Sequence, residues 1–299
     1  MTGPQSQQTV RRTGRLVLRR LLLGLVLFAA AVSALLLSHG VLLDWDRIDI
    51  EAERSRRFAQ AALGMALPGT PDLADLDGRL AAHELKLGAP VFIRIFKREF
   101  ELELWLKRGD NFHRFAVYPV CRWSGRLGPK LVEGDGQAPE GFYTVDAKAL
   151  NPASRWHRSF NLGYPNAFDR AHRRTGSFLM VHGGCTSIGC FAMTDGVIDE
   201  IWRLVTAALK GGQARFHVHV YPFRMTPENL SLRSGAPWQG FWQDLKRGHD
   251  LFEATLLPPK VSVCRGRYSF AAGPAGGNGS HEIDSGCAEL TSTGAGLKG

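Results

Sequence analysis

The sequence has no internal repeat, no nucleic-acid-binding motif and no complete set of metal ligands. The first absence excludes a repeat architecture. The second argues against nucleic acid as a partner, although the formal net charge is +9. His217 and His219 would share one face of a strand, but no third ligand accompanies them, so we interpret them as a surface pair rather than a zinc site. Disorder throughout is excluded, because 44% of the 299 residues are hydrophobic.

The N-terminal region carries much of the positive charge and the one long apolar run. Residues 1–20 contain five arginines and are predicted to be cytoplasmic, while residues 21–37 contain no charged residue and the run continues to Leu43. A helix over residues 21–43 would be about 34 Å long, close to the thickness of a bilayer's hydrocarbon core. Basic residues before it and Asp44 and Asp46 after it predict a membrane anchor with the remainder exported. A cleaved signal peptide is the alternative, and it would export the remainder as well.

The cysteine count is low and odd, with one residue each at Cys121, Cys185, Cys190, Cys264 and Cys287. In an exported chain, an odd count leaves at least one thiol free unless the pairing is intermolecular. Cys185 could pair with Cys190, or it could pair elsewhere, for example with Cys121, and leave Cys190 free. Cys264 and Cys287 could close a separate loop. The spacing does not decide between these pairings.

The remaining chain divides by composition into a helical linker, a strand-rich domain and a tail. Residues 44–87 are predicted to be two helices separated near Pro68, and we assign them no chemistry. Residues 88–265 alternate between apolar and polar positions in several short runs, which indicates a mostly antiparallel sheet or sandwich. We also expect a helix from Thr194 or Asp195 to Lys210 and a second one over about residues 238–245. Residues 266–299 are rich in Gly, Ser and Ala and are predicted to be a flexible tail.

The segment from Phe178 to Thr194 combines a strand, His182, a loop of small residues and Cys190. A cysteine attacks a carbonyl as the thiolate, and histidine is the side chain best suited to accept its proton near neutral pH. We therefore expect a reactive thiol of lowered pKa at Cys190. Gly189 would allow close approach of substrate, and the N–H groups of Gly189 and Cys190 could face an oxyanion. Ser187 could be a hydrogen-bonding partner of the histidine or of the substrate. The alternatives to catalytic roles are that His182 is a hydrogen-bonded core residue and that Cys190 is a packing residue or half of a disulfide.

Several motifs in this domain resemble one known family. His182-Gly183 followed by Ser187-Ile188-Gly189-Cys190-Phe191-Ala192-Met193 resembles the signature of L,D-transpeptidases with a YkuD-type catalytic domain, and it is most similar to the YafK-like branch. Many family members have a second histidine two residues before the cysteine. This chain has Ile188 at that position, and the YafK-like branch also lacks the histidine. Further matching segments follow in order over residues 88–268: Pro90–Lys97, Cys121–Lys130, Ala138–Tyr143, Gly163–His172, Tyr221–Met225 and Pro258-Pro259.

The resemblance implies a mainly β, sandwich-like L,D-transpeptidase domain with a few helices. With the apolar N-terminal run as its anchor, we expect this domain to be held at the inner membrane and to face the periplasm. The resemblance also implies Cys190 as nucleophile and His182 as base, a thioester with diaminopimelate of peptidoglycan stem peptides, and no metal or organic cofactor. Arg122 and Arg170 could bind stem-peptide carboxylates, with Tyr164 and Asn166 beside Arg170. A structural ion pair of Asp169 with Arg170 is the alternative to that role.

Two further functions stay open beside the transferase. One is an amidase or hydrolase that releases proteins from peptidoglycan, with a wall-linked outer-membrane protein as a partner. The other is a peptidoglycan-binding module without catalysis.

Overall fold

The computed structural model describes residues 5–38 and 45–287, and the chain divides into two compact units at residues 48 and 49. The first unit is dominated by helix α1 (Gln5–Ser38). Within α1, Val17–Ala34 is long and apolar enough to cross a membrane, a test that a signal sequence also passes. The expected span over residues 21–43 is therefore helical as far as Ser38, and its last five residues lie outside the described part of the chain.

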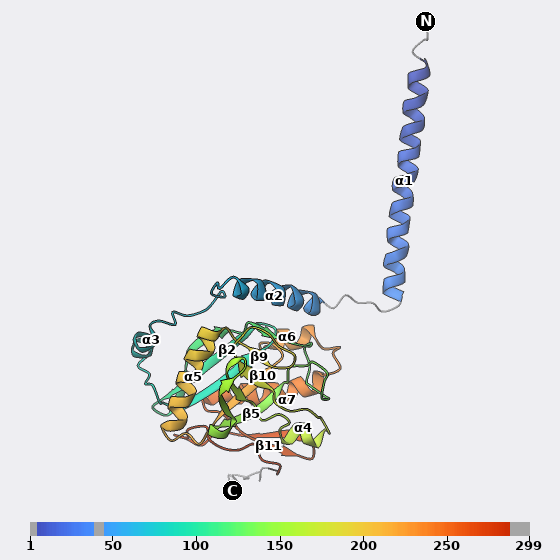
Figure 1. Cartoon of the computed structure of the whole chain (residues 1–299). Helices are drawn as coiled ribbons and strands as arrows, with labels where there is room; N and C mark the ends of the chain where they lie inside the picture. The colour runs from blue at the N-terminus through green and yellow to red at the C-terminus, as the bar shows by residue number, and fades with distance from the viewer. Residues whose placement is uncertain (1–4, 39–44, 288–299) are drawn as a thin grey trace, which may run out of the picture. The chain divides into compact units, whose positions relative to one another are not determined.

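The second unit is built on two five-stranded sheets (Figure 1). The first sheet has the order β3 (Asn111–Pro119), β2 (Glu101–Arg108), β1 (Val91–Phe96), β10 (Arg215–Tyr221), β5 (Gly141–Asp146). The second has the order β4 (Arg122–Trp123), β9 (Phe191–Ala192), β8 (Met180–His182), β7 (His157–Asn161), β6 (Leu150–Ser154). The pairs β1/β10 and β8/β9 are parallel, so each sheet is mixed rather than purely antiparallel.

Three of the helices that follow α1 are long. These are α2 (Trp45–Ala62), α5 (Asp195–Lys210) and α7 (Gln239–Thr255), the last continuing ten residues past its predicted end. The shorter elements are α3 (Leu76–Ala82), the 3-10 turn η1 (Ala147–Ala149), α4 (Ala167–Ala171) and α6 (Pro227–Leu232). The domain is therefore a sheet-rich mixed fold with several helices, and it contains more helix than the sandwich expected from the sequence.

The main hydrophobic core contains residues of both sheets and the apolar side of α5. Strand β1 contributes Ile93 and Ile95 to it, while the alternate residues Phe92 and Phe96 pack in two other clusters with residues of α7. All six residues of β1 are consequently buried, because both faces of the first sheet are covered.

The two-sided covering of the first sheet also corrects the interpretation of the histidine pair. His217 and His219 are fully buried, so they are not a surface pair. His217 Nε2 donates to the carbonyl oxygen of His281 at 2.8 Å, and burial lowers the pKa of His217 to about 3. In the part of the chain described here, no group of three or more His, Cys, Asp or Glu side chains is arranged to hold a metal ion.

The segment predicted to be a linker packs against the sheets. Ile50 belongs to the main core, and two arginines of α2 are almost fully buried. Arg54 donates to the carbonyl oxygen of Gly125 at 2.8 Å and lies 4.2 Å from the centre of the Trp123 ring. Arg57 donates to the carbonyl oxygen of Val120 at 3.1 Å. From residue 49 onward, the helix is thus a structural part of the domain.

The structure contains two disulfides, Cys121–Cys185 and Cys264–Cys287, and leaves Cys190 free. The second disulfide lies in the region predicted to be a flexible tail. That prediction is wrong for residues 267–287, because Arg267–Ala271 forms β12, which pairs with β11 (Lys260–Cys264), and the disulfide holds Cys287. Residues 288–299 lie outside the described residues.

Lys97 and Glu140 form an ion pair that is completely buried, with Nζ and Oε1 2.8 Å apart. Lys97 Nζ also donates to three backbone carbonyls, those of Arg126, Gly128 and Ala138. Glu140 accepts from the N–H of Gly128 and from the Trp242 indole. The pair therefore holds the connection between β4 and β5 against the first sheet. Glu140 is thus a buried structural residue with three side-chain or backbone partners.

Candidate active site

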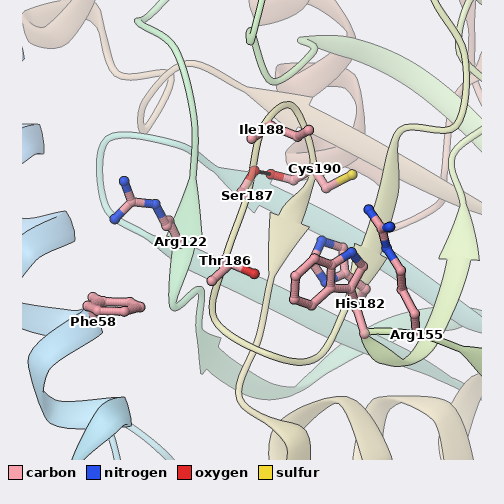
Figure 2. Close-up of a pocket in the computed structure, with 9 residues that line it drawn as sticks. Phe58, Arg122, Arg155, His182, Thr186, Ser187, Ile188 and Cys190 are labelled. Carbon is pink, nitrogen blue, oxygen red and sulfur yellow. Dashed lines mark hydrogen bonds between the residues drawn. The ribbon is translucent and has the colours of Figure 1, made fainter.

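Strands β8 and β9 bring Cys190 and His182 to the same face of the second sheet. Val181 pairs with Phe191 in parallel register, and both side chains are fully buried in the core. Because side chains alternate along a strand, His182 and Cys190 emerge on the opposite face. Met180 N–H donates to Cys190 Sγ at 3.4 Å, which keeps the cysteine beside β8. Both side chains line one pocket of about 490 Å³ (Figure 2).

The free thiol of Cys190 is partly buried at this pocket. Its Sγ donates to the carbonyl oxygen of Phe178 at 3.7 Å, and among the described residues no hydrogen bond joins it to His182. Burial raises the pKa of the Cys190 thiol above its ordinary value, although the Met180 N–H and the charge of Lys130 act in the opposite direction. The expectation of a lowered Cys190 pKa was therefore wrong for the chain without substrate. Burial of the thiol opposes its ionisation, and a sequence motif does not show how deeply a side chain is buried.

His182 is 2% exposed, and its tautomer follows from one hydrogen bond. Nδ1 lies 2.5 Å from the carbonyl oxygen of Gly183, so Nδ1 carries the proton and Nε2 keeps its lone pair. Burial lowers the pKa of His182 below the ordinary value of 6.5. At neutral pH the pair is consequently a neutral thiol and a neutral imidazole, and the proton would move during the attack on substrate.

The tip of the β6–β7 hairpin covers His182. The Trp156 ring stacks over the imidazole with 6.1 Å between centroids and an interplanar angle of 30°. The Arg155 guanidinium lies 5.2 Å from the centre of the same indole ring. Neither residue was predicted to belong to the site, because the two strands have five residues each and lack clear apolar alternation.

Two glycines are required by the geometry of the catalytic loop. A Cβ on Gly183 would lie 2.5 Å from Asp195 Oδ1 and 3.0 Å from the Cβ of His157, which is too close for any side chain. Gly189 has φ +145°, a backbone conformation that other residues rarely adopt. Asp195 is the first residue of α5, and its carboxylate accepts from the N–H of Gly184 at 2.9 Å.

Ser187 shapes the turn that presents the cysteine. Its hydroxyl donates to the carbonyl oxygen of Cys190 at 2.7 Å and accepts from the N–H of Gly189 at 3.2 Å. The structure therefore does not bring Ser187 to His182 as a hydrogen-bonding partner. Because the Gly189 N–H is already engaged, the N–H of Cys190 is the better candidate for an oxyanion donor.

The pocket lining is apolar and basic. It consists of Phe58, Arg122, Arg155, Trp156, His182, Thr186, Ser187, Ile188 and Cys190, and it includes no acidic residue from the described chain. Phe58 comes from α2, to which the sequence assigned no chemistry. Thr186 Oγ1 is buried without a hydrogen-bond partner among the described residues.

Comparison with known proteins identifies the family of this site. The model of the YkuD L,D-transpeptidase catalytic domain matches residues 92–240. The chain is also 49% identical over 182 residues to YafK of Escherichia coli K12, which is named as a candidate L,D-transpeptidase, and the match covers 61% of this chain and 74% of YafK. The chain belongs to the YkuD-type L,D-transpeptidase family. The YafK protein of strain O157:H7 matches to the same extent.

Solved structures are more distant from this L,D-transpeptidase. The helical cell shape determining protein Pgp2 from Campylobacter jejuni is 18% identical with a TM-score of 0.37, and the match covers 51% of this chain and 57% of Pgp2. Bd1075 from Bdellovibrio bacteriovorus is 19% identical with a TM-score of 0.33, and the match covers 56% of this chain and 58% of Bd1075.

The candidate substrate residues of this L,D-transpeptidase separate into two groups. Arg122 lines the Cys190 pocket, whereas Arg170, Tyr164 and Asn166 do not. Asn166 caps α4 and donates to the carbonyl oxygen of Phe142 at 2.7 Å. The other two make backbone contacts, since the Tyr164 hydroxyl donates to the carbonyl oxygen of Lys130 and Arg170 donates to that of Pro165.

The neighbouring carboxylate, Asp169, also has a structural partner. It pairs with Arg174 at 2.8 Å and not with Arg170. Together with the cap of α4, this ion pair stabilises the segment after residue 163 and leaves it outside the pocket.

Ile188 takes the position at which many L,D-transpeptidases have a second histidine. Its side chain is 88% exposed and lines the pocket that also contains Cys190. The site therefore contains a single histidine, His182, and any base function depends on that residue.

Proposed function

We propose that this chain is a peptidoglycan-modifying cysteine acyltransferase that acts on stem peptides at diaminopimelate through a Cys190 thioester. One observation carries the proposal: the free thiol of Cys190 shares a pocket with a neutral imidazole whose Nε2 lone pair is not engaged within the described chain. Membership of the YkuD family and the absence of acidic lining residues support an acyl-transfer reaction on an anionic peptide.

The proposed reaction has two halves. In the first, Nε2 of His182 takes the thiol proton, Sγ bonds to the carbonyl carbon, and the C–N bond breaks as the imidazolium returns the proton to the leaving amine. In the second, an acceptor amine or water gives a proton to His182 and attacks the thioester carbonyl carbon. The C–S bond then breaks, and the imidazolium returns the proton to the leaving sulfur. The N–H of Cys190 would stabilise the oxyanion in both halves.

Whether an amine or water accepts the acyl group defines the two versions of the activity. Transfer to an amine makes a crosslink or attaches a protein, whereas transfer to water would release a wall-linked protein, such as one of the outer membrane. We favour the amine, because the YkuD family is typically one of L,D-transpeptidases.

The test incubates the full chain in detergent with tetrapeptide and protein-linked muropeptides, an amine acceptor and ¹⁸O-labelled water. We expect mass spectrometry to find an amine-containing product that Cys190→Ser does not make. Incorporation of ¹⁸O alone would make the chain a hydrolase. If the wild type and Cys190→Ser both bind muropeptides and convert none, the chain is a binding module and the proposal fails.

We also propose that α1 anchors the chain in the inner membrane with the catalytic domain in the periplasm. Its apolar segment and the arginines before that segment support this orientation. We expect protease added to spheroplasts to digest a C-terminal tag, and N-terminal sequencing of the membrane fraction to find the first residues retained. A mature chain that begins after α1 would show a cleaved signal peptide, and a protected tag would contradict export.

A further inference from the structure

Two arginines lie on opposite sides of the Cys190 pocket. Arg122 belongs to β4 and Arg155 to the β6–β7 turn, while the strand order β4-β9-β8-β7-β6 places Cys190 and His182 between them. Figure 2 shows the two guanidinium groups on either side of the cysteine and the histidine. Three strand spacings separate β4 from β7, so the two backbones are about 14 Å apart. One bound peptide can therefore contact both arginines only if it crosses the nucleophile.

Neither guanidinium has an ion-pair partner within the residues that the structure describes, although most arginines of the domain form such pairs. Arg122 lies close enough to Arg54 of α2 for its positive charge to act on that second guanidinium. Within the described part of the chain, the contact made by the Arg155 guanidinium is the one with the Trp156 ring. Two uncompensated guanidinium groups at one pocket attract anionic groups, and the planar guanidinium matches a carboxylate through paired hydrogen bonds.

We propose that Arg122 and Arg155 are two separate carboxylate subsites, each of which binds one of the two carboxylates that flank the scissile carbonyl of the donor peptide. This inference rests on the proposed function, because the scissile carbonyl must lie at Sγ of Cys190. A donor of this class has a dicarboxylic diamino acid on the acyl side and a leaving amino acid with a free carboxylate. Amidation of either carboxylate removes one of the two contacts.

The test pairs charge deletions in the enzyme with charge deletions in the substrate. The full chain, Arg122→Gln and Arg155→Gln are assayed on three tetrapeptide donors: the diacid, its side-chain carboxamide and its C-terminal amide. We expect each substitution to raise KM for the diacid by roughly 10- to 100-fold with little change in kcat. The KM of each variant should not change when the carboxylate that its missing arginine would bind is amidated, because a contact that is already absent cannot be lost twice. Amidation of the other carboxylate should raise the KM of that variant as much as it raises the KM of the wild type.

Arg126→Gln is the matched control. The substitution removes the same charge as the two test substitutions, and Arg126 is exposed and does not line the pocket. Its KM should stay within twofold of the wild-type value. If the losses from substitution and amidation multiply for every pair, or if the wild type is indifferent to both amidations, the two subsites do not exist while the enzyme activity stands. A wild type that converts no donor, like Cys190→Ser, would refute the proposed function itself and this inference with it.

Discussion

Replacing His182 by glutamine is expected to lower kcat/KM on muropeptide donors by roughly 10²- to 10⁴-fold. Glutamine is of similar size, and its amide can still donate to the carbonyl oxygen of Gly183, as Nδ1 does. It has no nitrogen that accepts a proton near neutral pH, so the thiol would have to ionise without help. A single histidine lines this pocket, which leaves no second base to take over.

The pH dependence provides the mechanistic readout of this variant. Burial lowers the pKa of His182 below 6.5, and the neutral form is the one that accepts a proton. Wild-type kcat/KM should therefore be maintained as the pH falls to 6.5 and decline only at lower pH, as the imidazole becomes protonated. The decline should be absent in His182→Gln, with a melting temperature that stays within a few degrees. A wild-type decline centred above pH 6.5, or one that persists in the variant, would show that His182 is not the base.

Replacing Lys97 by methionine should reduce the free energy of unfolding by about 3–5 kcal/mol, because it leaves a buried carboxylate without its partner. Glu140 is completely buried, and three backbone carbonyls lose the Nζ donor at the same time. Urea unfolding of the full chain, followed by tryptophan fluorescence, measures the loss. This residue lies outside the Cys190 pocket, so any fall in activity should follow the loss of folded protein.

The matched control for Lys97 removes both charges. In the double variant Lys97→Met and Glu140→Gln, the amide oxygen can still accept from the Gly128 N–H and the Trp242 indole. We expect the double variant to be more stable than Lys97→Met alone, because no uncompensated charge remains buried. Equal stability of the two variants would mean that packing and backbone contacts, rather than the carboxylate, account for the cost.

The parts of the fold that sequence patterns predicted are those that depend on local periodicity. Helix α5 was predicted from its apolar stripe and from Gly211, which follows its last residue, and it begins and ends as expected. Strands β4 and β9 have two residues each, which is too short for any period to be visible. His217 and His219 were misplaced because α7 and the C-terminal segment cover the outer face of the first sheet, an arrangement that no local pattern contains.

For the site as well, residues that are close in sequence could be predicted, and residues from distant segments could not. The segment from His182 to Cys190 is contiguous, so its strand, loop and cysteine could be identified together. Trp156, Arg155 and Phe58 reach the pocket from distant segments and could not. The direction of the Cys190 pKa shift depends on the burial of the thiol in the folded domain, which explains why the motif alone predicted the opposite direction.

The Cys121–Cys185 disulfide joins the start of β4 to the loop between the histidine and the nucleophile. Such bonds form outside the cytosol, where thiols are not kept reduced. A newly synthesised chain would therefore have this loop untethered, and the two sulfurs would close it only after translocation. The loop between His182 and Cys190 would then take its closed form only in the compartment proposed for the domain.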